Sequence, residues 1–571
     1  MRGCRRRLLA AAALCALAAA AAAGCAAEPE GTLRTHVDDW RDEVIYQIVV
    51  DRFDNGDPSN DRLDGVGVIK GDLARYQGGD WRGVINRLGY IERLGASAIW
   101  LSPVVENVAR NDYQDGYHGY WASDFTRVNR RFGSLSDLQA LVAEAHRRGI
   151  KVIIDIVTNH AGRVFFYDFD GDGRATPGEI EPAYSARGPI DAPLVWLSPK
   201  PPHVFRYLSD DPSVPPERVP LRAEHFHRRG QTTDHDDPVQ KERGDFPTGL
   251  RDLDTERDDV VRAMIDTYLR WVELTDVDGF RLDAVPHVPR AFWQRFARAL
   301  RQRLADRGKH RFMLLGEVFD GDAEKLASYT RDGGLDAVFD FPLKWEVIDG
   351  FIYDGNPAAS TRGALAGYRD HFPQRGHDGG VELSPWQARV AMASNHDMPR
   401  LRYWLNDPFA AELAMTVVFT VDAVPAIYYG CEQALDGGWG NLSREPLWRA
   451  KRAFDESART YRAIQTLARL RREQRALRRG TLQVRYASKI SARQRGAGAG
   501  LLAYERADGD SRVLVALNGH PIDNARARVP TGFAPGTRLR DALAGERLVV
   551  DDSGGVSVDV APRRALILVA E

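Results

Sequence analysis

Cysteine is scarce in this 571-residue chain, and charge of one sign forms no long block. Three of the four cysteines, Cys4, Cys15 and Cys25, fall within the first 25 residues. Cys431 is then the single cysteine of the remaining chain, which excludes an internal disulfide there. We expect Cys431 itself to be a small buried residue. The formal charge is −2, so nothing favours nucleic acid as a partner. Beyond the N-terminus, no segment is long and apolar enough to span a bilayer.

The N-terminus has the pattern of an export signal. Basic residues at Arg2 and 5–7 precede an Ala/Leu-rich stretch at 8–23, which is too short for a permanent membrane helix. The stretch ends in Ala-Ala-Gly-Cys25, which resembles a bacterial lipobox. We therefore expect a signal peptide at 1–24, a lipid on Cys25, and a polar tether at 25–40 that holds the protein at the cell envelope. Ordinary cleavage, giving a secreted or periplasmic protein, is the alternative.

Apolar runs typical of strands alternate with amphipathic runs typical of helices beyond residue 40, as in βα units around a parallel sheet. Helices are expected between the strands, for example at 135–148 and 260–274. Eight such units predict an α/β fold, a closed (β/α)8 TIM barrel with its chemistry at the carboxyl ends of the strands. The eight strand-like runs are 44–50, 98–104, 152–157, 279–285, 312–318, 337–341, 388–393 and 425–429.

Two regions interrupt this rhythm. The stretch 161–246, rich in Asp, Gly, Pro and His, is too long for a plain βα loop and predicts an inserted subdomain after the third strand. From about residue 480, short strand-like runs predict a C-terminal antiparallel β-sandwich domain. The expected organisation is a barrel at 41–160 and 247–478, with the insert at 161–246 and the β-domain at 479–571. The strand-like runs of that last domain are 501–505, 512–518, 557–560 and 565–569.

Acidic residues end three of the strand-like runs: Asp283, Glu317 and Asp397. Buried acids are costly unless they are paired or functional. Alternate residues of a strand share a face, so Arg281 should lie beside Asp283 and keep it ionised. Glu317 follows an apolar run, where a carboxyl can hold its proton and act as a general acid. One attacking carboxylate and one proton-donating acid are what glycosidic-bond chemistry needs; acids that only cap strands are the alternative.

Four short segments resemble the motifs of the α-amylase family of glycoside hydrolases: 155–160, 279–287, 316–318 and 394–397. The resemblance extends from about Val44 to the C-terminus. It implies that Asp283 is the nucleophile, Glu317 the acid/base and Asp397 the transition-state stabiliser of a retaining double displacement.

The same resemblance implies a set of sugar-binding residues. Tyr117 would stack on the ring of the reacting sugar, and Phe319 matches an acceptor-side aromatic of the family's transferases. The other residues expected to line this subsite are His118, Arg281, His396 and Arg400.

Calcium is the cofactor that the sequence implies, at two or three sites. The segment 55–61 resembles the N-terminal calcium loop of cyclodextrin glucanotransferases and related amylases, and is dense in hard oxygen ligands. The ligands implied there are Asn55, Asp57, Asn60, Asp61, Asp80 and the carbonyl of Gly78. A second calcium of the family would correspond to Asn159, Asp252 and His287.

A third calcium signal does not depend on the resemblance. Residues 168–179 fit a twelve-residue EF-hand loop, with Asp168, Asp170, Asp172 and Glu179 at positions 1, 3, 5 and 12 and glycine at position 6. An acidic surface loop is the alternative. His225, His227 and His235 could suggest zinc, but we expect solvated histidines of the insert.

The function that the sequence favours is hydrolysis of α-1,4 bonds in an α-glucan oligo- or polysaccharide such as starch or maltodextrin, by a monomer. Thr248 stands where cyclising transferases place a central aromatic, and the single C-terminal domain also favours hydrolysis. A cyclodextrin glucanotransferase, a maltogenic or neopullulanase-like enzyme, and an α-glucosidase or trehalose-type enzyme remain alternatives. A non-catalytic glycan-binding lipoprotein is the remote one.

Overall fold

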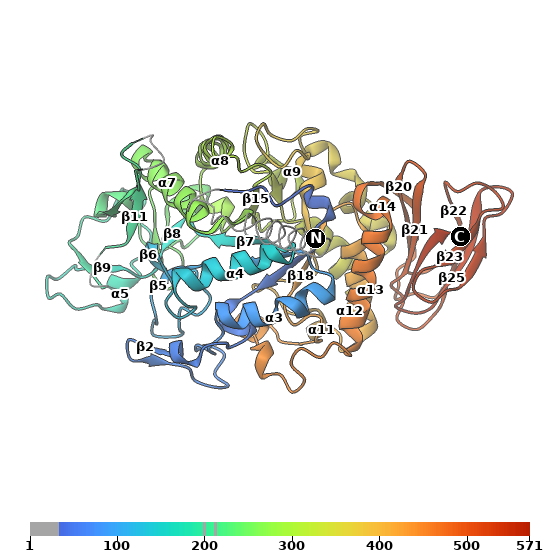
Figure 1. Cartoon of the computed structure of the whole chain (residues 1–571), viewed down its shortest axis with the longest axis horizontal. Helices are drawn as coiled ribbons and strands as arrows, with labels where there is room; N and C mark the ends of the chain where they lie inside the picture. The colour runs from blue at the N-terminus through green and yellow to red at the C-terminus, as the bar shows by residue number, and fades with distance from the viewer. Residues whose placement is uncertain (1–32, 198–200, 210–213) are drawn as a thin grey trace, which may run out of the picture.

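Eight parallel strands form the centre of the computed structural model, which describes residues 33–197, 201–209 and 214–571 (Figure 1). Their order in the sheet is β16-β15-β14-β7-β4-β1-β18-β17, and a parallel bridge between Phe339 and Val390 joins the two ends. The predicted (β/α)8 barrel is therefore confirmed, with all eight strands inside the expected runs or within one residue of them. The strands are β1 (Ile45–Ile48), β4 (Ala98–Leu101), β7 (Lys151–Ile156), β14 (Gly279–Leu282), β15 (Met313–Gly316), β16 (Ala337–Val338), β17 (Val390–Met392) and β18 (Val424–Tyr428).

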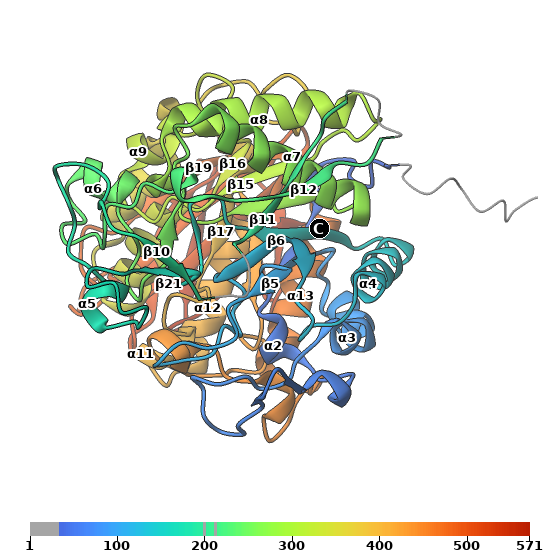
Figure 2. The same cartoon turned by 90° about the vertical axis from the view of Figure 1, so that its left-hand side faces the viewer.

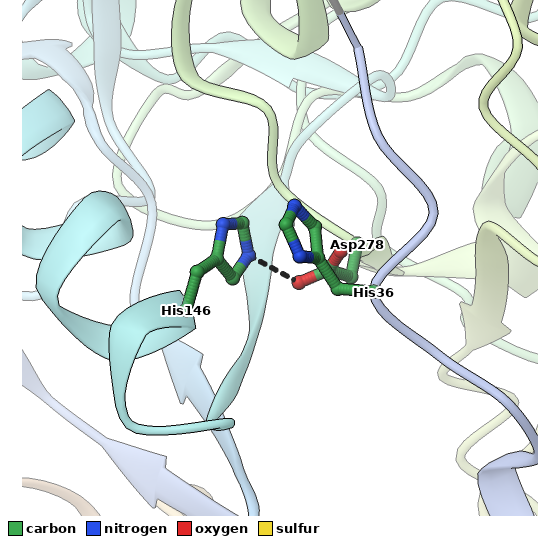
Figure 3. A group of neighbouring side chains, drawn as sticks. All are labelled: His36, His146 and Asp278. Atoms are coloured by element: carbon green, nitrogen blue, oxygen red, sulfur yellow. Dashed lines mark hydrogen bonds and ion pairs between the residues drawn. The ribbon is translucent and has the colours of Figure 1, made fainter. Parts of the chain in front are cut away.

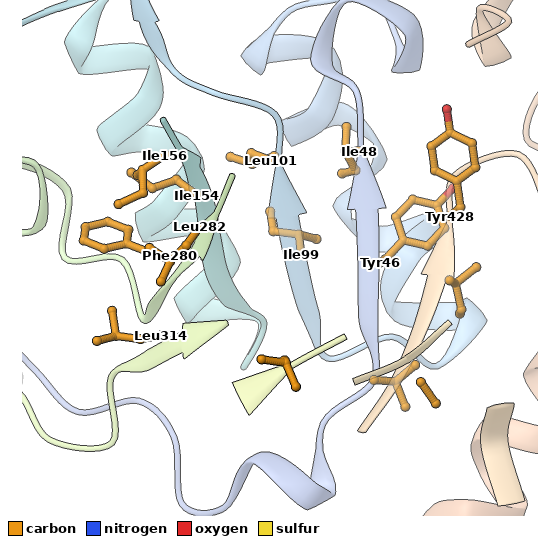
Figure 4. Close-up of a cluster of buried hydrophobic side chains, with 14 of the residues drawn as sticks. Tyr46, Ile48, Ile99, Leu101, Ile154, Ile156, Phe280, Leu282, Leu314 and Tyr428 are labelled. Carbon is orange, nitrogen blue, oxygen red and sulfur yellow. The ribbon is translucent and has the colours of Figure 1, made fainter. Parts of the chain in front are cut away.

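Side chains of the barrel strands alternate between two apolar cores. In β4, Ala98 and Trp100 belong to the core inside the barrel, whereas Ile99 and Leu101 pack outward in the core shared with the surrounding helices (Figure 4). This period of two is why the fully buried strands appear as continuous apolar runs in the sequence. The main helices of the outer layer are α3 (Trp81–Leu94), α4 (Leu135–Arg147), α7 (Asp258–Thr275), α8 (Arg290–Ala305), α12 (Pro408–Thr420) and α13 (Arg459–Glu473).

Short antiparallel pairs occupy the chain between the third and fourth barrel strands, and Figure 1 places them at the end of the molecule opposite the C-terminal sheets. The pair formed by β8 and β13 joins the beginning and the end of this segment to each other. The elements of the segment are β8 (His160–Ala161), β9 (Phe165–Tyr167), α5 (Pro177–Ile180), β10 (Leu194–Trp196), β11 (His203–Arg206), β12 (Glu217–Pro220), α6 (Pro238–Arg243) and β13 (Arg251–Asp252).

The C-terminal region forms antiparallel sheets, as predicted. A six-stranded sheet in the order β19-β20-β21-β26-β23-β24 packs against the pair β22–β25, and Leu514 of the first shares an apolar core with Val556 of the second. The opposite face of the large sheet, with Tyr504 and Val515, belongs to the core of the barrel helices. The strands are β19 (Thr481–Ala487), β20 (Leu501–Asp508), β21 (Ser511–Asn518), β22 (Ala525–Pro530), β23 (Arg538–Asp541), β24 (Arg547–Val549), β25 (Gly555–Val560) and β26 (Ala565–Ala570).

The segment before β1 is bound to the amino-terminal end of the barrel strands (Figure 3). The ring of His36 stacks on His146 with 3.6 Å between centroids, and its Nε2 lies 2.9 Å from Asp276. His146 Nε2 lies 2.8 Å from Asp278, which directly precedes β14. The Lys309 ammonium lies 2.7 Å from Asp276 and 3.2 Å from Asp278. Because this cation pairs with both carboxylates, the cluster is an ion-pair network that holds the segment in place.

The predicted signal peptide and Cys25 lie outside the described residues. Within the described part of the chain, no helix combines the length and the apolar character that crossing a bilayer requires.

Candidate active site

Three acidic side chains gather at the carboxyl end of the barrel. Asp283 directly follows β14, Glu317 directly follows β15, and Asp397 comes five residues after β17. The backbone N–H groups of Asp283 and Glu317 still donate to the neighbouring strands, at 3.0 Å each. Because the parallel strands all end at the same side of the barrel, the fold brings these acids to one site, as expected.

The guanidinium of Arg281 binds two of the three acids. Its Nη1 lies 2.6 Å from Asp283 Oδ1 and 2.9 Å from Asp155 Oδ1, and its Nη2 lies 2.7 Å from Glu317 Oε1. The arginine is fully buried, so these contacts are shielded from water. The predicted pairing of Arg281 with Asp283 is present, and Arg281 also fixes Glu317 beside them.

Glu317 lies in an environment that favours its protonated form. Burial raises its pKa to about 8, the negative charges of Asp283 and Asp397 act in the same direction, and the positive charge of Arg281 opposes them. A carboxyl group that keeps its proton near neutral pH can serve as a general acid.

Asp397 is more accessible, with 39% of its side chain exposed. Burial acts to raise its pKa, but the surrounding charges, including that of Arg444, hold the pKa below its ordinary value. Arg444 Nη2 lies 2.9 Å from Asp397 Oδ1, and His396 Nε2 lies 3.2 Å from Oδ2. This acid is therefore an anion at neutral pH that faces the open side of the site.

The histidines expected in the sugar-binding subsite are buried around these acids. His118 accepts a hydrogen bond from the Tyr120 backbone N–H at 3.1 Å, and burial lowers its pKa well below the ordinary value. The ring of His396 stacks on Tyr120 at 5.2 Å with an interplanar angle of 5°, while its Nδ1 lies 2.8 Å from Gln47. Both histidines are neutral hydrogen-bonding groups in this setting.

Tyr117 does not have the role expected from the sequence. Its side chain is fully buried, the Arg52 guanidinium covers its ring at 3.6 Å, and its hydroxyl donates to Asn441. The prediction that Tyr117 stacks on a sugar is therefore wrong, because no face of the ring is open. Tyr120 is partly exposed, donates to Asp155 at 2.7 Å and lies next to His396. It is the better candidate for that contact.

Arg400 also differs from its expected role. Its side chain is fully buried, donates to the Tyr429 carbonyl at 2.6 Å and pairs with Glu445. It supports the loop that follows β18 and does not line the subsite. Phe319, in contrast, is 47% exposed and packs against Phe341 and Trp345, so its ring is available beside Glu317.

Several residues of the site were missed by sequence reasoning. Arg444 binds Asp397 although 47 residues separate them, and Asn441 and Gln47 also come from loops or strands without a motif. Tyr120 lies next to the expected subsite residues Tyr117 and His118, and Asp155 begins the family motif 155–160. Their polar side chains beside apolar runs were the signal by which the sequence could have assigned them to the site.

The predicted N-terminal calcium loop brings several oxygen atoms together. Asn55 Nδ2 donates to Asp61 Oδ1 at 2.9 Å, and a Cβ on Gly78 would lie only 2.5 Å from that oxygen. Asp80 caps α3 through the Gly83 N–H at 2.7 Å and lies 3.4 Å from Asn60 Nδ2.

Two acceptors in this loop lack a partner. The side-chain oxygens of Asn55 and Asn60 are buried without a hydrogen bond, as expected where a cation supplies the missing partner. The carboxylate of Asp57, like that of Asp80, also accepts a backbone hydrogen bond, from the Ser59 N–H at 3.1 Å.

The second predicted calcium site is only partly assembled. The Leu253 N–H donates to the Asn159 carbonyl at 2.9 Å, so Asn159 lies beside the strand that carries Asp252. Asp252 is buried, with Oδ2 2.5 Å from His227 Nδ1 and Oδ1 without a partner. The ring of His287 instead binds the Lys241 carbonyl at 3.0 Å. His227 is buried, contrary to the expectation of a solvated histidine.

The EF-hand-like loop adopts a compact turn. One oxygen each of Asp168, Asp170 and Glu179 lie within 4.8 Å of one another. Asp172 is outside this group and accepts from the Arg174 N–H at 2.7 Å. A strand precedes the loop and α5 contains its last acidic residue, so helices do not flank it on both sides. Together these three side chains offer carboxylate oxygens to a metal ion.

Comparisons with known proteins agree with this geometry. The family described as alpha amylase, catalytic domain, matches residues 47–458. An alpha-amylase of Streptomyces lividans is 32% identical over 558 residues, covering 89% of this chain, which spans only 58% of that relative's length.

Solved structures give the same result. An Anoxybacillus alpha-amylase aligns with a TM-score of 0.72 at 28% identity, covering 94% of this chain and 99% of the other. The three-domain cyclomaltodextrin glucanotransferase CldA aligns with a TM-score of 0.73 at 27% identity, covering 93% and 99%. The chain is a member of the alpha-amylase family of glycoside hydrolases.

Proposed function

We propose that this protein hydrolyses α-1,4-glucosidic bonds of starch, maltodextrin or related α-glucans by retaining double displacement. The observation that carries the proposal is the pair of acids on one buried guanidinium: Arg281 binds both Asp283 and Glu317, and Glu317 has a pKa of about 8. A retaining glycosidase needs one nucleophilic carboxylate and one protonated acid on opposite sides of the scissile bond.

In the first step of this scheme, an Asp283 oxygen forms a bond to the anomeric carbon. The bond from that carbon to the leaving oxygen breaks, and the Glu317 proton moves to the leaving oxygen. Asp397, an anion held by Arg444, stabilises the positive charge that develops on the sugar ring. In the second step, water attacks the anomeric carbon, its proton passes to Glu317, and Asp283 is released.

Calcium is part of the proposal at the loop of Asn55 and Asp61 and at the loop of Asp168 and Glu179. The unpartnered oxygens of Asn55 and Asn60 support the first site, and the close carboxylates support the second. A bound ion would cross-link the first loop to the start of α3 and would stabilise the fold. Export, with lipid attachment at Cys25 or simple secretion, also belongs to the proposal, as does a monomeric state.

A cyclodextrin glucanotransferase is the second candidate. The similarity to a three-domain transferase and the exposed ring of Phe319 on the side of Glu317 favour it. In a transferase, the second step would use a sugar hydroxyl in place of water. Thr248 favours hydrolysis, because it offers no aromatic ring around which a glucan could wrap.

Product analysis tests these candidates. Purified protein lacking residues 1–32 is incubated in calcium buffer with soluble starch, maltoheptaose, β-cyclodextrin and pullulan, with Asp283→Asn as the control. Short maltooligosaccharides from starch would support the amylase assignment, whereas cyclodextrins or longer chains would support a transferase. Cleavage limited to cyclodextrin, pullulan or short chains would indicate a maltogenic or neopullulanase-like enzyme. No turnover of any substrate would refute the proposal.

A further inference from the structure

Three exposed aromatic side chains lie together at the carboxyl end of the barrel. Tyr403 and Trp404 end α11 (Leu401–Trp404), which is orange at the lower left of Figure 2, and Trp439 comes from the loop after β18. Their exposed fractions are 46%, 53% and 56%. Within the described residues, Trp404 and Trp439 are the two tryptophans exposed to this degree. These three side chains are called the aromatic platform below.

The rings of the platform are arranged edge to face. The centroids of Tyr403 and Trp404 are 5.0 Å apart at 75°, and those of Trp404 and Trp439 are 6.4 Å apart at 80°. Tyr403 rests on the backbone of Gly438, where a Cβ would lie 2.7 Å from the ring. A Cβ on Gly437 would lie 1.7 Å from the Leu442 carbonyl. The two glycines thus let the loop pass close to Tyr403, and the platform is formed before any ligand binds.

The loop that presents Trp439 is also bound to the active site. Two residues later, Asn441 accepts the hydroxyl of Tyr117, and Arg444 binds Asp397 at 2.9 Å. The Arg400 N–H donates to the Gly437 carbonyl at 3.0 Å, which ties the loop to the segment that carries Tyr403. The platform is therefore connected to the site of Asp283 and Glu317 through the same short segments that position Asp397.

We propose that the aromatic platform binds an α-glucan chain beyond the reacting sugar and gives the enzyme a preference for long chains. The proposal rests on the proposed function, and the ligand is the chain whose reacting sugar lies between Asp283 and Glu317. A pyranose ring presents a face of C–H groups that packs on an aromatic ring, and a polymer offers such faces at regular intervals. A cluster of large solvent-exposed aromatic rings indicates a binding surface. The three side chains of the platform carry no charge, which matches an uncharged glucan.

The test compares long and short substrates in the full protein without residues 1–32. The ratio of kcat/KM for amylose to kcat/KM for maltotetraose is measured for the native protein and for the double variant Trp404→Ala/Trp439→Ala. We expect the ratio to fall about tenfold, the size of loss expected for two stacking contacts. A variant that is merely less stable would lose activity on both substrates and leave the ratio unchanged. Ile522→Ala is the control, because Ile522 is an apolar residue that is 68% exposed but lies before β22 in the C-terminal sheets.

Two further measurements separate the possible outcomes. The conservative double variant Trp404→Phe/Trp439→Phe should restore most of the ratio if ring stacking is the cause. Calorimetric titration of Asp283→Asn with maltoheptaose and amylose tests binding without turnover, so a failure of the proposed hydrolysis is distinguishable from a failure of the platform. An unchanged ratio would overturn the proposal. It would also be overturned if the sedimentation coefficient rises with protein concentration in the native protein but not in the alanine variant, because a second copy of the protein would then cover the platform.

Discussion

Hydrolytic activity should fall as the pH rises through 8, because Glu317 must be protonated to act as the acid. Its pKa of about 8 means that the protonated fraction drops from about 0.9 at pH 7 to about 0.1 at pH 9. We therefore expect kcat/KM for maltoheptaose to decrease about tenfold between these pH values. The measurement is a pH profile of kcat/KM from pH 5 to 10.

A matched variant identifies the group that titrates. Glu317→Gln cannot donate a proton, so it should lose activity on maltoheptaose but still react with α-glucosyl fluoride, whose leaving group needs no acid. With that substrate the alkaline decrease should disappear. Asp155 shares Arg281 with Glu317, and burial raises its pKa to about 7, so the profile reports the carboxylates as a group.

The melting temperature at each pH serves as the control, since unfolding at alkaline pH would imitate the effect. A decrease that persists in Glu317→Gln with the fluoride substrate would refute the assignment of Glu317 as the titrating acid. A native profile that stays flat to pH 10 would do the same.

Three further predictions concern the nucleophile, the calcium loop and the fold. Asp283→Asn should lower turnover of starch at least about 10⁴-fold while the melting temperature changes little; retained activity would exclude Asp283 as the nucleophile. Chelation with EDTA should lower the melting temperature, by the equivalent of about 2.7 kcal/mol if calcium was present at 100 times its Kd, and less so in Asp61→Ala. An unchanged melting temperature with no metal in the protein would contradict the calcium sites. Asp278→Asn should cost about 3 kcal/mol in urea unfolding at pH 7, because it leaves Lys309 and His146 with one carboxylate fewer. The pKa of Asp278 is lowered in the fold, so this stability is present above the unfolded pKa and is lost as the pH falls; a cost that does not shrink in acid would contradict the reasoning.

Much of the fold could be predicted from the sequence because buried parallel strands require continuous apolar runs. The run at 152–157 matches β7, and the run at 98–104 contains β4. The C-terminal strands were equally visible in alternating patterns such as 512–518. The calcium ligands stay predictions, although the unpartnered oxygen of Asn55 supports them.

The acids of the site could also be found in the sequence. An ionisable residue buried at the end of an apolar strand costs folding free energy unless it is paired or functional, so it stands out as a candidate. Asp283 and Glu317 are such residues, and the strand period placed Arg281 on the same face as Asp283. This alternation of side chains applies only to strands and does not predict which way loop side chains point. Tyr117 and Tyr120 lie three residues apart in one motif, and only the packing of Arg52 on the first ring decides which of them is open.

The sequence by itself determined the barrel, its C-terminal sheets and the strand-end acids, because these depend on the local order of apolar and polar residues. The tertiary structure decided the partners of those acids. Arg444 reaches Asp397 across 47 residues, and Trp439 meets Trp404 across 35, since the loops after the paired strands β17 and β18 converge only in the folded barrel. Closure also buries Glu317 beside other acids, and that burial raises its pKa to the range that acid catalysis requires.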